Sequence, residues 1–77
     1  MPQITIYTTP SCAYCKMAKE YFKMQGWEWT EKDVMQDIAA REEMIKNTGQ
    51  LGVPVINMNG KYIVGFDRKK IDEYATQ

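Results

Sequence analysis

The chain has 77 residues, which leaves room for only one hydrophobic core, so we expect a single domain over residues 1–77. Ten basic and ten acidic residues give a formal net charge of zero, which argues against a broad electrostatic surface for nucleic acid or an anionic membrane. The amino-terminal segment lacks the features of a secretory signal, and no apolar stretch approaches membrane-spanning length. We therefore expect a cytoplasmic monomer that binds neither nucleic acid nor membranes.

The first half of the chain predicts two strands with a helix between them. Residues 3–8 are β-branched and aromatic, as in a buried central strand. From Cys12 the apolar residues recur at helical spacing, and Gly26 ends this helix. Residues 27–32 alternate large apolar and polar side chains and predict a second strand, which its charge places at an edge of the sheet. The predicted inward face of the helix consists of Tyr14, Met17, Ala18, Tyr21 and Phe22.

The second half predicts a helix followed by a hairpin. The helix covers about residues 37–48, with an acidic start and with Gly49 as its stop. Residues 53–58 and 61–64 flank an Asn-Gly pair, the dipeptide that most favours a two-residue hairpin turn. The hairpin is therefore the strongest short-range prediction in this half.

A last helix completes the predicted fold. Asp67 caps it, and its inward residues are Ile71, Tyr74 and Ala75. The predicted order is β-α-β-α-β-β-α, in which a helical crossover joins the first two strands and a tight turn joins the last two. This order requires a four-stranded mixed sheet, with helices on both faces. A functional site is expected where the first strand ends and the first helix begins.

Cys12 and Cys15 form a Cys-x-x-Cys pair at that point. Unpaired main-chain N–H groups and the helix dipole favour an anion at the start of a helix, and the thiolate is the attacking species in disulfide exchange. Cys15 lies one turn inside the helix and should be less exposed, yet close enough to attack a mixed disulfide at Cys12. We therefore predict that Cys12 is the nucleophile and Cys15 the resolving thiol. The chain has no histidine, which excludes a Cys-His hydrolase.

Other interpretations of the two cysteines are open at this point. They could be buried small hydrophobic residues, although both lie where a strand leads into a helix. A structural disulfide across so small a loop would restrict the unfolded chain very little. Two cysteines without histidine cannot supply the four ligands of a closed zinc site from one chain. An iron–sulfur cluster shared between two chains, or completed by external thiols, is the alternative that involves a metal.

Four segments resemble the glutaredoxins and the glutaredoxin-like NrdH-type redoxins of the thioredoxin-fold superfamily, over nearly the whole chain. The resemblance implies a thioredoxin fold with sheet order 2-1-3-4 and an antiparallel last strand. It also implies that Pro54 follows a cis peptide bond and faces the nucleophile, with Val53 free to pair with an extended substrate peptide. The segments are YTTPSCAYC, Thr48-Gly49-Gln50, Val53-Pro54-Val55-Ile56 and Val64-Gly65-Phe66-Asp67.

The resemblance further implies a glutathione groove, to which the sequence would contribute Tyr14, Lys16, Gln50 and Asp67. Glutaredoxins usually carry Lys or Arg three residues before the first cysteine, where this chain has Thr9. Leu51 is neutral at a second position where a cation is expected, and Gly65-Phe66 resembles the NrdH-type redoxins more closely. The sequence thus combines features of both subgroups, and weak use of glutathione is expected.

The sequence predicts a thiol–disulfide oxidoreductase that reduces protein or glutathione mixed disulfides through a Cys12-Cys15 dithiol. No tightly bound cofactor is expected. Electrons would come from glutathione or from a thioredoxin-reductase-like flavoprotein, and the NrdH-type features imply ribonucleotide reductase as one acceptor. The alternative function is an iron–sulfur carrier that dimerises around a cluster held by Cys12 of each chain and glutathione.

Overall fold

The computed structural model describes residues 1–76, and their secondary structure follows the order β-α-β-α-β-β-α. The strands are β1 (Ile4–Thr8), β2 (Thr30–Asp33), β3 (Val55–Met58) and β4 (Lys61–Val64). The helices are α1 (Ala13–Met24), α2 (Ile38–Thr48) and α3 (Arg68–Ala75). The order confirms the predicted succession of elements. Within residues 1–76, no helix is long and apolar enough to cross a membrane.

The strands form one mixed sheet in the order β2-β1-β3-β4. β1 is parallel to β2 and antiparallel to β3, and β4 is antiparallel to β3. The helical crossover through α1 returns the chain in the same direction and makes the first pair parallel, whereas a tight turn makes the last pair antiparallel. β2 lies at an edge, as its charged sequence predicts. The predicted sheet order 2-1-3-4 is therefore confirmed.

The turn between β3 and β4 has the geometry that its sequence favours. Asn59 has a φ of 54° and Gly60 a φ of 89°, and a type I′ turn requires positive φ at both central residues. The side-chain oxygen of Asn57 accepts the N–H of Gly60 at 3.0 Å. The predicted hairpin is thus confirmed in its turn and in its second strand, Lys61–Val64.

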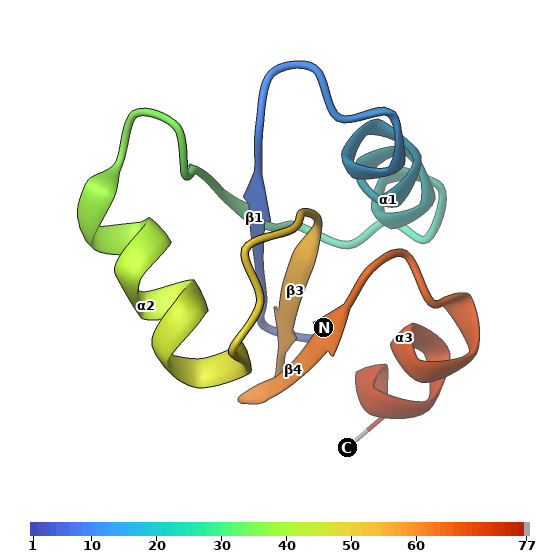
Figure 1. The fold of residues 1–77 in the computed structure, drawn as a ribbon. Coiled ribbons are helices and arrows are strands. Elements are labelled where there is room, and N and C mark those ends of the chain that lie inside the picture. The colour runs from blue at the N-terminus through green and yellow to red at the C-terminus, as the bar shows by residue number, and fades with distance from the viewer. Residues whose placement is uncertain (77) are drawn as a thin grey trace.

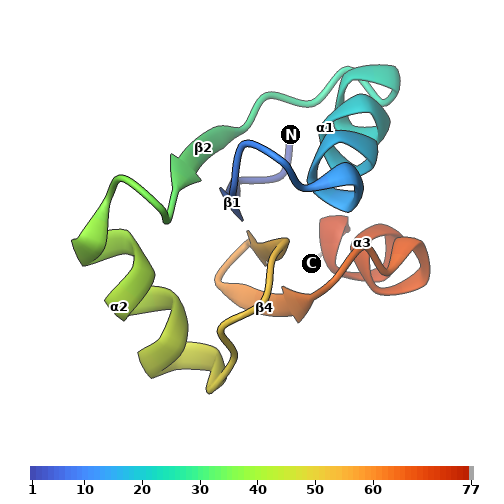
Figure 2. The same cartoon turned by 45° about the horizontal axis from the view of Figure 1, so that its top comes forward.

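Helices cover both faces of the sheet (Figure 1). Alternate residues of a strand point to opposite faces, so β1 directs Ile6 to one side and Tyr7 to the other. α1 and α3 pack on the Ile6 side and α2 on the Tyr7 side, and the turned view of Figure 2 shows the same separation. The smaller cluster, on the α2 side, contains Tyr7, Val34, Ala40, Met44 and Val55.

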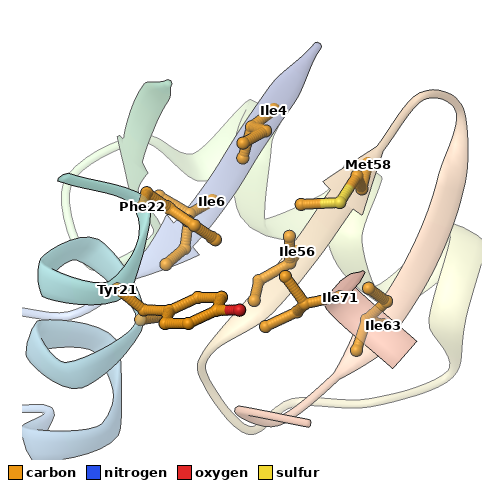
Figure 3. Close-up of a cluster of buried hydrophobic side chains, with 9 residues drawn as sticks. Ile4, Ile6, Tyr21, Phe22, Ile56, Met58, Ile63 and Ile71 are labelled. Atoms are coloured by element: carbon orange, nitrogen blue, oxygen red, sulfur yellow. The ribbon is translucent and has the colours of Figure 1, made fainter. Parts of the chain in front are cut away.

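The larger hydrophobic cluster fills the space between the sheet, α1 and α3. In Figure 3 the side chains from β1, β3, β4 and the two helices meet in one group. Trp27, Trp29 and Phe66 pack against its margin, together with Tyr74 and Ala75 of α3. The prediction that Ile71, Tyr74 and Ala75 of α3 face inward is therefore confirmed. The buried members are Ile4, Ile6, Ala18, Tyr21, Phe22, Ile56, Met58, Ile63 and Ile71.

The predicted inward face of α1 was partly wrong. Tyr14 is 62% exposed and Met17 50% exposed, whereas Cys15 and Ala18 are buried with Phe22. Ala18, Tyr21 and Phe22 are buried as predicted, and the first turn of α1 buries Cys15 instead of Tyr14. The first turns of α1 bury small side chains against the sheet, and a cysteine is a small hydrophobic residue in this setting.

Two strand boundaries also differ from the prediction. The segment from Trp27 does not join β2 at once, because the Trp27 N–H donates to the carbonyl of Phe22 at 3.0 Å and closes the end of α1. β2 begins instead at Thr30. β3 begins at Val55 rather than Val53, since Pro54 has no N–H to donate to a strand ladder.

Candidate active site

Cys12 lies at the start of α1, in a turn that follows β1. Its N–H donates to the carbonyl of Thr9 at 3.3 Å, and its φ of −89° and ψ of 111° give the extended backbone typical of a helix N-cap. Its Sγ accepts the N–H of Cys15 at 3.1 Å. The sulfur therefore occupies the place of the Ser or Asp oxygen at an ordinary N-cap, and it points at the positive end of the helix dipole.

The two thiols differ sharply in exposure. Cys12 is partly exposed and Cys15 is 1% exposed, and both are free thiols in this structure. Burial raises the pKa of the Cys15 thiol to about 12, and the hydrogen bond with Cys12 adds to this effect. Cys15 is therefore a protonated thiol at neutral pH. This arrangement suits a first attack by Cys12 and a later one by Cys15.

The peptide bond between Val53 and Pro54 is cis, as the resemblance implies. Pro54 is buried, and its carbonyl accepts the N–H of Gly65 at 2.8 Å. Within residues 1–76, neither the N–H nor the C=O of Val53 forms a hydrogen bond. Both groups of Val53 are thus free to pair with an extended peptide.

The other four predicted site residues come from three separate segments, and no hydrogen bond joins these segments through them within residues 1–76. Tyr14 and Lys16 are exposed in the first turns of α1. Gln50 is exposed after α2, with its N–H donating to the Thr48 hydroxyl at 3.1 Å. Asp67 is the N-cap of α3, and its carboxylate accepts the N–H of Lys70 at 3.2 Å. Asp67 therefore has a structural role at this helix end.

A surface hollow of about 360 Å³ lies beside the turn that leads to Cys12. Thr9 and Leu51, the two neutral residues noted above, both line it. Arg41 of α2 also lines it, and the sequence analysis missed this cation because only the fold brings α2 beside Thr9. Its remaining lining residues are Val34, Met35 and Ile38.

Metal ligation was also tested on the geometry. In the part of the chain that the structure describes, no three His, Cys, Asp or Glu side chains lie where they could together hold a metal ion. The two cysteines are the candidate ligands that a single chain brings to this site.

The fold and the cysteine pair at a helix start define a protein of thioredoxin-like fold with a Cys-x-x-Cys site. Residues 4–63 match the family model of the glutaredoxins. The chain therefore belongs to the glutaredoxin family, and this membership supports thiol–disulfide oxidoreductase activity.

Individual relatives agree with this assignment. An uncharacterised glutaredoxin-like 8.6 kDa protein in the rubredoxin operon of Clostridium pasteurianum is 46% identical over 70 residues, which cover 91% of this chain and 93% of that protein. Glutaredoxin 3 of Escherichia coli K12 is 37% identical over 67 residues, covering 87% of this chain and 81% of that protein. The solved structure of the NrdH-redoxin of Escherichia coli has a TM-score of 0.81 at 25% identity, over 92% of each chain.

Proposed function

We propose that this protein reduces disulfides by a dithiol mechanism. The Cys12 thiolate attacks a substrate disulfide, so that a Cys12–substrate S–S bond forms and the first substrate thiolate leaves. Cys15 then loses its proton to solvent and attacks Cys12. The Cys12–Cys15 bond forms, the mixed disulfide breaks, and the second substrate thiolate leaves. Two electrons pass from the protein dithiol to the substrate, and each departing thiolate takes up a proton.

One observation carries this proposal: the Sγ of Cys12 lies at the N-cap of α1, 3.1 Å from the N–H of Cys15, while Cys15 itself is buried. The exposed sulfur can reach a substrate, and the main-chain N–H stabilises its anion. The buried sulfur stays a thiol until a mixed disulfide forms next to it. Two idle core cysteines would not need this difference in exposure.

The test uses the two single serine variants with an oxidised peptide disulfide. Cys12→Ser should abolish reduction, because the exposed nucleophile is lost. Cys15→Ser should accumulate a mixed disulfide at Cys12, detected as an adduct by mass spectrometry, because nothing resolves it. An adduct that forms instead at Cys15 in the Cys12→Ser variant at the same rate would contradict these roles.

The partners follow from the same proposal. The acceptors are disulfide-containing proteins, whose extended segment can pair with the free N–H and C=O of Val53. The electron donor is glutathione or a thioredoxin-reductase-like flavoprotein in the cytoplasm. A thioredoxin-like activity profile is reported for the NrdH-redoxin of Escherichia coli, to which this chain is similar. That similarity, with the neutral Thr9, supports the flavoprotein as donor and ribonucleotide reductase as one acceptor.

A further inference from the structure

A small polar cluster joins α1 to β2 and β1, starting one helical turn after Cys15. Lys19 of α1 lies four residues after Cys15, and its Nζ contacts the two carboxylate oxygens of Glu31 at 3.0 and 3.2 Å. Glu31 belongs to edge strand β2, and it also accepts the hydroxyl proton of Thr8 at 2.8 Å. Thr8 ends β1 and is 1% exposed. The Lys19 side chain is therefore held by the Glu31 carboxylate, which in turn accepts a hydrogen bond from the buried Thr8 hydroxyl.

This cluster is a poor candidate for a stabilising device alone. The side chains of Lys19 and Glu31 are 28% and 40% exposed, and exposed ion pairs contribute little to stability. Residues four apart on a helix share one face, so Lys19 lies one turn from Cys15 on the same side of α1. A cationic side chain thus lies one helical turn from a thiol that the proposed reaction must ionise.

Few other charges act on Cys15. Along α1 the titratable neighbours are Cys12 and Lys19, and before the helix Thr9 contributes a main-chain hydrogen bond that favours the anion. Cys12 raises the pKa of Cys15, whereas the charge of Lys19 lowers it. From β2, the carboxylate of Glu31 pairs with the ammonium of Lys19. The charges of α3 that reach α1, on Arg68 and Asp72, are engaged with Tyr21.

We propose that Lys19 is a positioning residue for the resolving step. Its ammonium, held by Glu31, stabilises the negative charge that develops on Cys15 as this thiol attacks the Cys12 mixed disulfide. The inference rests on the proposed dithiol function. The chain has no histidine to serve as a base, so solvent takes the Cys15 proton and a fixed cation makes its departure easier. Lys19 transfers no atom or electron, and it acts only through the charge of Cys15.

Rapid mixing with dithiodipyridine separates the two steps, because each step releases one coloured, uncharged thiopyridone. Attack by Cys12 gives the first release, and attack by Cys15 on the mixed disulfide gives the second. Lys19→Met should slow the second release about threefold and leave the first unchanged. A rise of one unit in a thiol pKa lowers the thiolate fraction about tenfold. The greater nucleophilicity of the less acidic thiol offsets about a factor of three, so the rate falls about threefold.

Matched variants separate the charge of Lys19 from a structural role. Lys19→Arg should keep the rate of the second release. The double variant Lys19→Glu with Glu31→Lys keeps an ion pair between α1 and β2 but places an anion one turn from Cys15, so its second release should be slower than that of Lys19→Met. Lys23→Met removes an exposed cation from the last turn of the same helix and should change neither release.

Two results would overturn the role of Lys19. One is a second release in Lys19→Met that is as fast as in the unmodified chain. The other is restoration of that release by the charge-exchanged double variant, which would show that the ion pair matters only for structure. Failure of the dithiol function itself looks different, since the unmodified chain would then give a first release and no second one.

Discussion

At the scale of single residues, the choice of electron donor depends on the surroundings of Thr9. Its carbonyl holds the N–H of Cys12, while its neutral side chain lines the hollow that Leu51 and Arg41 share. Glutathione carries two carboxylates and one ammonium group, so a groove built for it needs a cation close to the nucleophile. Arg41 of α2 is a cation at this hollow, whose lining residues include Thr9 but not Cys12.

Thr9→Lys should raise turnover with glutathione about tenfold, because one charge-assisted hydrogen bond contributes roughly 1.5–3 kcal/mol and this site is partly solvated. Turnover with NADPH and thioredoxin reductase should change much less. Reduction of the oxidised protein by each donor system measures the two rates. Arg41→Gln is the matched control and should weaken whatever glutathione turnover the unmodified chain has. Efficient, saturable turnover with glutathione that is the same in Thr9→Lys would contradict this interpretation of the hollow.

At the scale of elements, α2 shows how helix ends substitute for a broad apolar face. Only Ala40 and Met44 of this helix are buried. Its start is fixed by Asp37, whose carboxylate accepts the N–H of Ala40 at 3.0 Å, and its end by Gly49, which has a left-handed φ of 69°. The caps satisfy groups that would otherwise be unpaired at both ends, so they determine the length of the helix.

Asp37→Ala should lower the free energy of unfolding by about 1 kcal/mol, because the Ala40 N–H loses its partner. Asp37→Asn keeps a side-chain oxygen at the same place and should cost much less. Urea unfolding followed by circular dichroism measures both values. Equal losses in the two variants would show that the charge of Asp37, rather than its hydrogen bond, supports the helix.

The elements that the sequence predicted well are those with local signals. The Asn-Gly turn, the Asp67 cap and the strand before Cys12 each depend on neighbouring residues only, and all were placed correctly. The buried face of the first turns of α1 and the start of β2 depend on tertiary contacts, and these two predictions were wrong for Tyr14 and Met17 and for the segment before Thr30. The motif marks Cys15 as a reactive group, and nothing local in the sequence shows that it is also a core residue. Trp27 has the side chain of a strand residue, but its N–H donates to Phe22 at the end of α1.

The candidate site divides in the same way. Cys12 and Cys15 could be predicted because motif and helix start coincide in the sequence. Glu31 and Arg41 could not, since they approach the site from β2 and α2 only after the parallel register of β1 and β2 and the packing of α2 are established. Lys19 carries a weak signal, its spacing of four from Cys15, which gains meaning only through Glu31.

At the scale of the whole molecule, hydrogen bonds between ionisable side chains connect elements on both faces of the sheet. On one face they join a helix to a strand, and on the other they join two helices. On the α2 face the Tyr7 hydroxyl donates to Glu43, and the Lys32 Nζ lies 5.8 Å from the centre of the Tyr7 ring. On the other face Tyr21 donates to Asp72, so α1 is joined to α3. These bonds raise the pKa of the Tyr7 and Tyr21 hydroxyls and lower the pKa of the Glu43 carboxylate, which links the stability of the fold to pH.

The signs of this linkage follow from the pKa shifts. The Tyr7 pKa is raised by burial and by its bond to Glu43, and burial raises that of Cys15 to about 12. The unfolded chain therefore releases these protons first, and stability falls as pH rises above the ordinary thiol pKa of 9.0. The pKa values of Glu43 and Glu31 are lowered, by hydrogen bonds from Tyr7 and Thr8 first. The stability that these two carboxylates contribute is present above the ordinary glutamate pKa of 4.5, and it is lost as pH falls through and below that pKa.

Tyr7→Phe should flatten both limbs of the stability curve of the reduced protein. On the alkaline limb, the raised pKa of the Tyr7 hydroxyl makes stability fall more steeply with pH, and on the acid limb the same hydroxyl holds Glu43 ionised. The variant should be less stable than the unmodified chain at neutral pH by about 1 kcal/mol, the usual contribution of one hydrogen bond, and the difference should shrink towards both extremes of pH. Chemical unfolding at a series of pH values under reducing conditions measures the curve. Tyr14→Phe, at a tyrosine that is 62% exposed, is the control and should leave the curve unchanged. A constant difference between Tyr7→Phe and the unmodified chain across the whole pH range would mean that Tyr7 contributes by packing alone.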